Sequence, residues 1–185
     1  MFKQGHSLGR QLAKFIPEIK QLCQEFSGVN VWFMGRDMDV FYLALKDEYK
    51  NVRYLVGLNR ENARHLDHRH LLEKWLRSIG VKDGDVLIDS GFRGSIFERI
   101  NGTKLKLNYF LLSARSDSFC APINKELSEK YRTAILALEH SPKKEICSWD
   151  IKNRRPKVIK IGGQERIKID RFYAGCIAAL RGEPM

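Results

Sequence analysis

Two aspartates, Asp37 and Asp39, stand two residues apart directly after the apolar segment Val29–Met34. If that segment is a strand, both carboxylates lie at its carboxyl end and can approach one Mg²⁺ ion together. One of them could instead act as a nucleophile while the other moves a proton. The structural alternative is that Asp39 caps the following helix while Asp37 pairs with Arg36. The spacing alone does not distinguish metal binding, catalysis and a structural role for these two aspartates.

A second polar cluster follows the apolar segment Asp85–Ile88 and combines a carboxylate, glycines, an arginine and hydroxyls. Its members are Asp89, Ser90, Gly91, Arg93, Gly94 and Ser95. Glycines let the backbone turn tightly and approach a ligand, and the start of a helix offers free N–H groups to a phosphate. Arg93 can pair with the same anion, and Asp89 can accept hydrogen bonds from sugar hydroxyls. The cluster predicts a phosphate or sugar-phosphate site; the structural alternative is a glycine turn with Ser95 as a helix cap.

Asn59 and Arg60 follow another apolar segment and are expected at the same ligand-binding edge. A weaker candidate is a metal-binding cluster made of Asp67 and three histidines, at positions 65, 68 and 70. A helical zinc pair usually stands at i and i+4, whereas the histidines stand at i, i+3 and i+5. We interpret them as solvated side chains of a charged helix.

Strands and helices must position these candidate site residues. Short apolar segments predict strands at Val29–Met34, Val52–Leu58, Asp85–Ile88 and Leu107–Leu112. Helical spacing predicts helices from Ser7 to Phe26 with a break at Pro17, from near Asp39, over Glu61–Ile79, from Ser95 to Ile100 and over Phe172–Leu180. Tyr131–Leu138 fits either a helix or a strand.

Alternating strands and helices indicate an α/β fold. We expect a single Rossmann-like domain with a mostly parallel sheet of about four to five strands, covered by helices on both faces. Ligands of such sheets bind at the carboxyl ends of the strands, which is where the polar clusters fall. We expect this ligand-binding domain over residues 1–140 and a basic appendage packed on it over residues 141–185.

The net charge of the chain predicts the kind of molecule that it binds. The chain has 33 basic and 22 acidic residues, a formal net charge of +11, which favours nucleic acid, nucleotides or phosphorylated substrates. Candidate contacts with a nucleic-acid backbone are Lys152, Arg154, Arg155 and Lys157. Alternation of apolar and charged residues predicts a hairpin here, with Val158–Ile161 and Ile167–Ile169 joined through Gly162 and Gly163.

Composition excludes several classes of protein. With 185 residues and 43% hydrophobic content, the chain is long and apolar enough for one folded domain. A membrane-spanning helix needs about 20 consecutive apolar residues, and the apolar stretches here are the length of a strand. The amino terminus lacks the pattern of a secretory signal, and the four cysteines form no Cys-x-x-Cys pair. We therefore expect a cytoplasmic protein with reduced thiols and no membrane partner.

The residues from 29 to 115 resemble a type I phosphoribosyltransferase. The resemblance rests on Val31–Asp37 after a helix and on Val86–Ser95 after a later strand. It implies that Asp89 holds ribose hydroxyls and that Gly94 and Ser95 hold the 5′-phosphate. It also implies that Arg36 and Asp37 hold pyrophosphate with Mg²⁺.

Asp37-Met38-Asp39-Val40 after a strand is also similar to the first motif of haloacid-dehalogenase-like phosphohydrolases. That resemblance makes Asp37 the phosphorylated nucleophile and Asp39 the acid–base residue. Lys74, and either Asp85 or Asp89, would stand in for the later lysine and metal-binding acids.

From the sequence we favour the transferase over the phosphohydrolase. Both hypotheses bind a phosphorylated sugar or nucleotide with Mg²⁺ as the expected cofactor. A third hypothesis, from another class, is a non-catalytic nucleic-acid-binding or ligand-sensing module, whose mark would be salt-sensitive binding of polyanions without turnover.

Overall fold

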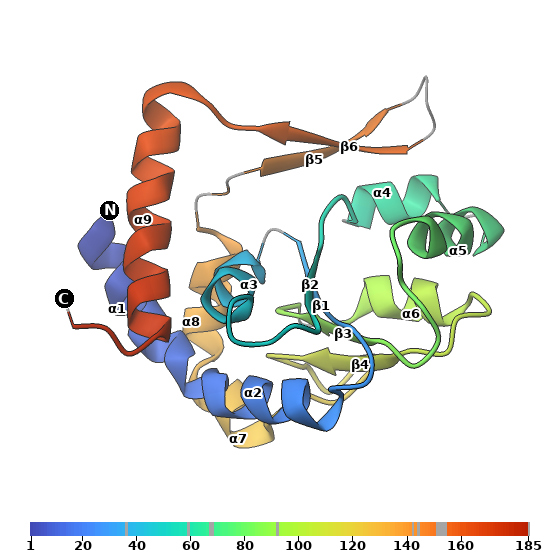
Figure 1. The fold of residues 1–185 in the computed structure, drawn as a ribbon, viewed down its shortest axis with the longest axis horizontal. Helices are drawn as coiled ribbons and strands as arrows, with labels where there is room; N and C mark the ends of the chain where they lie inside the picture. The colour runs from blue at the N-terminus through green and yellow to red at the C-terminus, as the bar shows by residue number, and fades with distance from the viewer. Residues whose placement is uncertain are drawn as a thin grey trace.

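A four-stranded parallel sheet with the order β2-β1-β3-β4 forms the centre of the computed structural model (Figure 1). Its strands are β1 (Val31–Met34), β2 (Val52–Leu55), β3 (Val86–Asp89) and β4 (Asn108–Leu111). The structure describes residues 1–35, 37–58, 60–66, 69–91, 93–141, 143, 145–150 and 155–184. The α/β architecture predicted from the alternation of strands and helices is confirmed.

Helices cover both faces of this sheet. One face carries α1 (Phe2–Leu12), the 3₁₀ turn η1 (Ala13–Phe15), α2 (Ile16–Glu25), α3 (Asp39–Leu45), α7 (Lys125–Lys130), α8 (Arg132–Glu139) and α9 (Gly163–Leu180). The other face carries α4 (Arg60–His65), α5 (Arg69–Ser78) and α6 (Ser95–Asn101).

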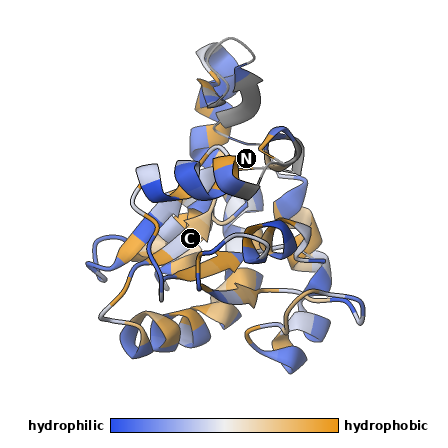
Figure 2. Ribbon diagram, turned by 90° about the vertical axis from the view of Figure 1, so that its right-hand side faces the viewer, coloured by the Kyte–Doolittle hydropathy of each residue, from blue (hydrophilic) through white to orange (hydrophobic). Residues whose placement is uncertain are grey.

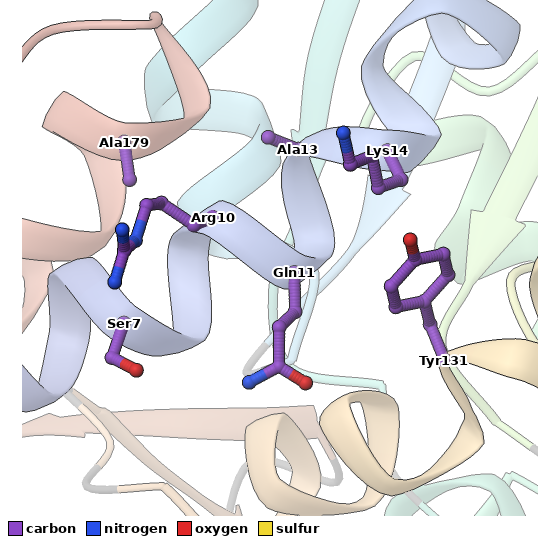
Figure 3. Close-up of a pocket in the computed structure, with 7 residues that line it drawn as sticks. All are labelled: Ser7, Arg10, Gln11, Ala13, Lys14, Tyr131 and Ala179. Carbon is purple, nitrogen blue, oxygen red and sulfur yellow. The ribbon is translucent and has the colours of Figure 1, made fainter.

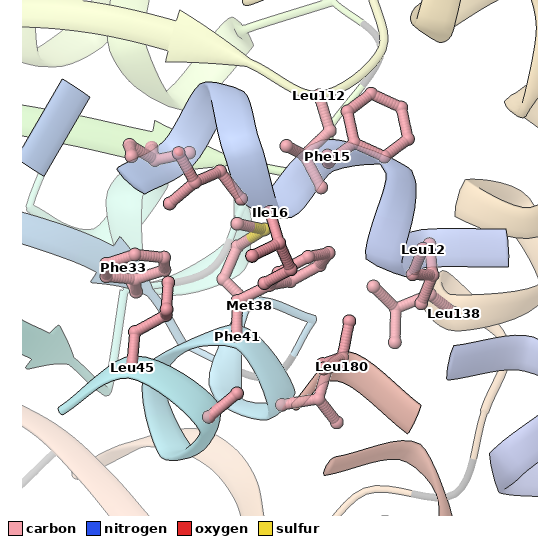
Figure 4. Packing of buried hydrophobic residues seen from close by; sticks show 14 of the residues in the cluster. Leu12, Phe15, Ile16, Phe33, Met38, Phe41, Leu45, Leu112, Leu138 and Leu180 are labelled. Atoms are coloured by element: carbon pink, nitrogen blue, oxygen red, sulfur yellow. The ribbon is translucent and has the colours of Figure 1, made fainter. Parts of the chain in front are cut away.

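The strands divide their side chains between two hydrophobic clusters. Val31 and Phe33 of β1 belong to the cluster under α1, α2 and α3, whereas Trp32 and Met34 belong to the cluster under α5 and α6. Successive side chains of a strand point to opposite faces, so a strand buried on both faces is apolar throughout. Figure 2 shows this apolar centre in orange, and Figure 4 shows Phe33 packed among side chains of the first cluster.

The two ends of the chain pack against each other through α1 and α9 (Figure 1). A Cβ atom added to Gly5 would overlap the carbonyl oxygen of Phe172, and one added to Gly175 would overlap that of Phe2. Glycine at both positions therefore allows the two helix backbones to approach closely. Through α9, the basic C-terminal segment contributes buried side chains to the main core.

The predicted hairpin across Gly162 and Gly163 is wrong. β6 (Arg155–Lys160) pairs antiparallel with β5 (Glu145–Asp150), which precedes it, and α9 begins at Gly163. Residues 167 to 169 are helical because buried side chains continue at helical spacing through Ile169, Phe172, Tyr173 and Cys176. Alternation over three residues is too short to distinguish this pattern from a strand.

Other differences concern helix boundaries. Pro17 lies in the first turn of α2, and the 3₁₀ turn η1 separates α2 from α1, so the predicted break is confirmed. The helix expected over Glu61–Ile79 is two helices, α4 and α5, with residues 67 and 68 between them outside the described part. The ambiguous segment Tyr131–Leu138 is helical, in α8. In the described part of the chain, no helix has the length and apolar character that crossing a bilayer requires.

Candidate functional site

The three candidate catalytic aspartates converge at the carboxyl edge of the sheet. Asp37 and Asp39 follow β1, and Asp89 is the last residue of β3. Because β1 and β3 are hydrogen-bonded neighbours running in parallel, the loops that leave them meet. Their contact is direct: the hydroxyl of Ser90 donates to Oδ2 of Asp37 over 3.2 Å.

The turn after β1 needs a glycine at position 35. The N–H of Gly35 donates to the carbonyl of Leu55 in β2 over 2.6 Å. A Cβ atom at this position would lie 2.8 Å from that carbonyl oxygen and 3.0 Å from the Cα of Val56. The close approach of the two strand ends therefore excludes a side chain here and places Asp37 over the sheet edge.

Asp37 is buried and makes its second polar contact with a lysine. The Nζ atom of Lys143 lies 2.8 Å from Oδ1 of Asp37, and only 11% of the Asp37 side chain and 15% of the Lys143 side chain are exposed. Lys143 comes from the segment that joins α8 to β5. Its ammonium compensates the Asp37 charge, which would be costly to bury alone.

Lys143 is held in place by two hydrogen bonds besides its ion pair with Asp37. Its ammonium donates to the carbonyl of Leu138 over 2.6 Å and to the hydroxyl of Ser141 over 3.2 Å. These two acceptors orient the ammonium, and the ion pair with Asp37 adds to its placement before any ligand binds. A cation held in this way can stabilise negative charge without reorganising during a reaction.

Asp39 has different surroundings from Asp37. It is the first residue of α3, is buried, and accepts a short hydrogen bond at Oδ2 from the hydroxyl of Tyr173 in α9. Its other oxygen, Oδ1, is buried without a hydrogen-bond partner among the described residues. Burial raises the pKa of Asp39 from 3.8 to about 6, although Tyr173 and the charge of Lys143 act to lower it. Asp39 can therefore hold a proton in weakly acidic solution.

Asp89 is also shifted toward its protonated form. Burial and the nearby charge of Asp37 raise its pKa from 3.8 to about 7, against the lowering effect of hydrogen bonds from the backbone of Ser90 and Gly91. A Cβ atom on Gly91 would lie 2.8 Å from Oδ2 of Asp89. The glycine thus leaves room for this carboxyl group beside the backbone.

The rest of the loop after β3 is occupied by internal contacts. The guanidinium of Arg93, expected on a phosphate, pairs with Asp117 at 3.0 and 3.1 Å. Gly94 has a left-handed conformation, with φ of 66°, at the residue before α6, and Ser95 is the first residue of that helix. The glycine turn of the structural alternative is present, but the N-cap of α6 is Gly94 without a side-chain cap hydrogen bond, so Ser95 is not the helix cap. The use of Arg93, Gly94 and Ser95 on a phosphate stays a prediction.

Several other predicted site residues fall where less can be described. Arg36, Asn59, Lys152 and Arg154 lie outside the described residues, and Arg60 and Arg155 are described by backbone alone. Lys157 is exposed on β6.

The phosphohydrolase resemblance suggests a lysine and a second acid beside Asp37, and not all of its candidates lie there. Lys74 is exposed on α5, and the cation beside Asp37 is Lys143. Asp85 precedes β3 at the opposite edge of the sheet, where it accepts hydrogen bonds from the Trp32 indole over 2.7 Å and the Asn30 backbone over 3.0 Å. Asp85 thus has structural contacts, and of the two only Asp89 lies at the carboxyl edge of the sheet.

Magnesium binding finds little support in this arrangement. No three side chains of the ligating types come together as a metal site within the described ranges. The ammonium of Lys143 already lies 2.8 Å from Oδ1 of Asp37. Magnesium stays a prediction.

Sequence reasoning missed Lys143 and Tyr173. Both reach the aspartates from segments more than 100 residues further along the chain. No local spacing marks either one, because the contacts depend on how α9 packs against α3 and on where the segment after α8 lies. Tyr173 carries only an indirect signal, a hydroxyl within the apolar face of a predicted helix.

Searches of protein-family models, curated proteins and solved structures found no match to this chain.

Proposed function

We propose that this protein is a phosphohydrolase that moves a phosphoryl group from a phosphorylated sugar or nucleotide to Asp37 and then to water. The observation that carries the proposal is the pair of unlike carboxyl groups at the end of β1. The charge of Asp37 is compensated by the ammonium of Lys143, whose Nζ lies 2.8 Å from Oδ1 of Asp37. By contrast, burial raises the pKa of Asp39 to about 6. Two carboxyl groups whose environments differ in this way suit a nucleophile and an acid–base residue.

The proposed reaction has two steps. An Asp37 oxygen attacks phosphorus, the bond from phosphorus to the leaving oxygen breaks, and protonated Asp39 gives its proton to that oxygen. Water then attacks the same phosphorus, Asp39 takes a proton from the water, and the bond to Asp37 breaks to release phosphate. Lys143 stabilises the charge that develops on the phosphoryl oxygens.

The phosphoribosyltransferase hypothesis has less support from these contacts. It assigns pyrophosphate to Arg36 and Asp37, and Arg36 is outside the described residues. It also needs the loop from Asp89 to Ser95 for a sugar phosphate, and Arg93 in that loop pairs with Asp117.

A panel of phosphate compounds tests the proposal. Phosphate release is measured with p-nitrophenyl phosphate, sugar phosphates, nucleotides, phosphoribosyl diphosphate and a 5′-phosphorylated RNA, each with and without Mg²⁺. The RNA is included because of the net charge of +11. We expect turnover that falls by at least about 10³-fold in Asp37→Asn, with Asp47→Asn, an exposed aspartate at 71% side-chain exposure, as the matched control.

Each other outcome has a definite meaning. Pyrophosphate release from phosphoribosyl diphosphate in the presence of an acceptor base would favour the transferase. RNA binding that weakens with salt, without turnover of any compound, would favour the non-catalytic module. Turnover that survives Asp37→Asn would exclude Asp37 as the nucleophile.

A further inference from the structure

The outer side of α1 carries a positively charged hollow separate from the aspartate site. It has a volume of about 510 Å³ and is lined by Ser7, Arg10, Gln11, Ala13, Lys14, Tyr131 and Ala179. Figure 3 shows these side chains coming from three elements that are distant in the sequence: α1 with η1, the α7–α8 junction and the end of α9. None of them belongs to the aspartate site.

The position of the hollow follows from the amphipathic character of α1. Gly5, Leu8, Gly9 and Leu12 are buried on one side of the helix. The polar residues at positions 7, 10, 11 and 14 follow the i, i+3, i+4, i+7 spacing of a single opposite face. They therefore form one wall of the hollow, and the apolar parts of Ala13 and Ala179 contribute to its lining.

The charge of the hollow is not neutralised. Neither Arg10 nor Lys14 forms an ion pair with any residue in the described ranges. All of the described lining residues are basic, neutral polar or alanine. A concave surface lined by one sign of charge concentrates its field on a ligand of the opposite sign.

We propose that this hollow binds a small molecule with a diphosphate group, of the nucleoside diphosphate class. Arg10 of α1 and Lys14 of η1 both line the hollow, and two cations around one hollow favour a ligand that carries more than one negative charge. Ser7, Gln11 and Tyr131 supply hydrogen-bond donors around them. The volume of about 510 Å³ exceeds the needs of a single phosphate and is within the usual range for organic ligands.

Titration with ADP tests this site. We expect ADP to bind the wild-type protein at the hollow, whose lining residues are all outside the aspartate site. The double variant Arg10→Glu/Lys14→Glu should weaken binding at least about 10-fold through the reversed charge. Adenosine, which lacks phosphate, should bind neither protein measurably.

Two controls make the result specific. Lys50→Glu/Lys82→Glu changes the net charge by the same amount at exposed positions elsewhere and should leave ADP binding unchanged. Circular dichroism checks that each variant is folded. The proposal is overturned if ADP binds the Arg10/Lys14 variant as tightly as the wild type, if both double variants weaken binding equally, or if no binding occurs at millimolar concentration. Because activity is not the readout, this test can fail while the phosphohydrolase proposal stands, and the reverse.

Discussion

At the scale of single residues, the proposed chemistry depends on how the protein sets the proton affinity of Asp39. The hydrogen bond from Tyr173 lowers the pKa of this carboxyl, while burial raises it to about 6. In Tyr173→Phe the lowering contact is lost, so the pKa of Asp39 should rise and its protonated form should persist to higher pH. We therefore expect the alkaline limb of the plot of kcat/KM against pH to move to higher pH by roughly half to one unit.

The control for this variant is Tyr42→Phe. Tyr42 is a half-buried tyrosine of α3 whose ring stacks on Tyr54 at 5.1 Å, and it lies outside the proposed catalytic contacts. The pH dependence of kcat/KM in this variant should match that of the wild type. An unshifted limb in Tyr173→Phe would show that Asp39 is not the group that titrates during catalysis.

At the scale of elements, α1 and α9 depend on a glycine contact that also supports the site. A Cβ atom on Gly175 would overlap the carbonyl oxygen of Phe2, so Gly175→Ala must push the two helices apart. We expect it to lower the free energy of unfolding by roughly 1–3 kcal/mol in urea titrations. Activity should fall as well, because the same helix carries Tyr173.

Gly28→Ala is the matched control. No atom lies within 4 Å of the position that its Cβ would occupy, so this change should alter the free energy of unfolding by at most about 0.5 kcal/mol. Equal effects of the two substitutions would contradict the close packing of α1 on α9.

The elements also show where sequence reasoning succeeds and where it fails. Asp37, Asp39 and Asp89 could be predicted as one site because they follow apolar strands whose carboxyl ends must meet in a parallel sheet. Lys143 could not, since its position depends on the tertiary packing of a segment with no local pattern. The hairpin was misplaced because the isoleucines near position 167 fit a strand over three residues and a helix only over a longer span.

At the scale of the whole molecule, the partly buried carboxyl group of Asp89 makes stability depend on pH. Burial raises the pKa of Asp89 from 3.8 to about 7, so the native state keeps this proton while the unfolded state loses it near its ordinary value. The stabilising contribution of the protonated group is complete below about pH 4 and is lost as the pH rises through 7. In Asp89→Asn this loss should disappear. The free energy of unfolding of the variant, measured relative to the wild type, should therefore be roughly 1–3 kcal/mol higher at pH 8 than at pH 4.

Urea unfolding of both proteins at the two pH values measures this difference directly. Asp47→Asn, with its side chain 71% exposed, shows what an aspartate-to-asparagine change does at the surface. If the stability difference between Asp89→Asn and the wild type were the same at pH 4 and pH 8, the Asp89 carboxyl would not be perturbed by burial.

The most direct test of the central claim is to trap the phosphorylated form of Asp37. p-Nitrophenolate leaves without a proton, so Asp39→Asn should still allow the first step with p-nitrophenyl phosphate but slow the attack by water. We predict a burst of p-nitrophenolate stoichiometric with protein, and borohydride reduction followed by peptide mass spectrometry should find homoserine at position 37. Turnover without a burst and without modification of Asp37 would contradict the account.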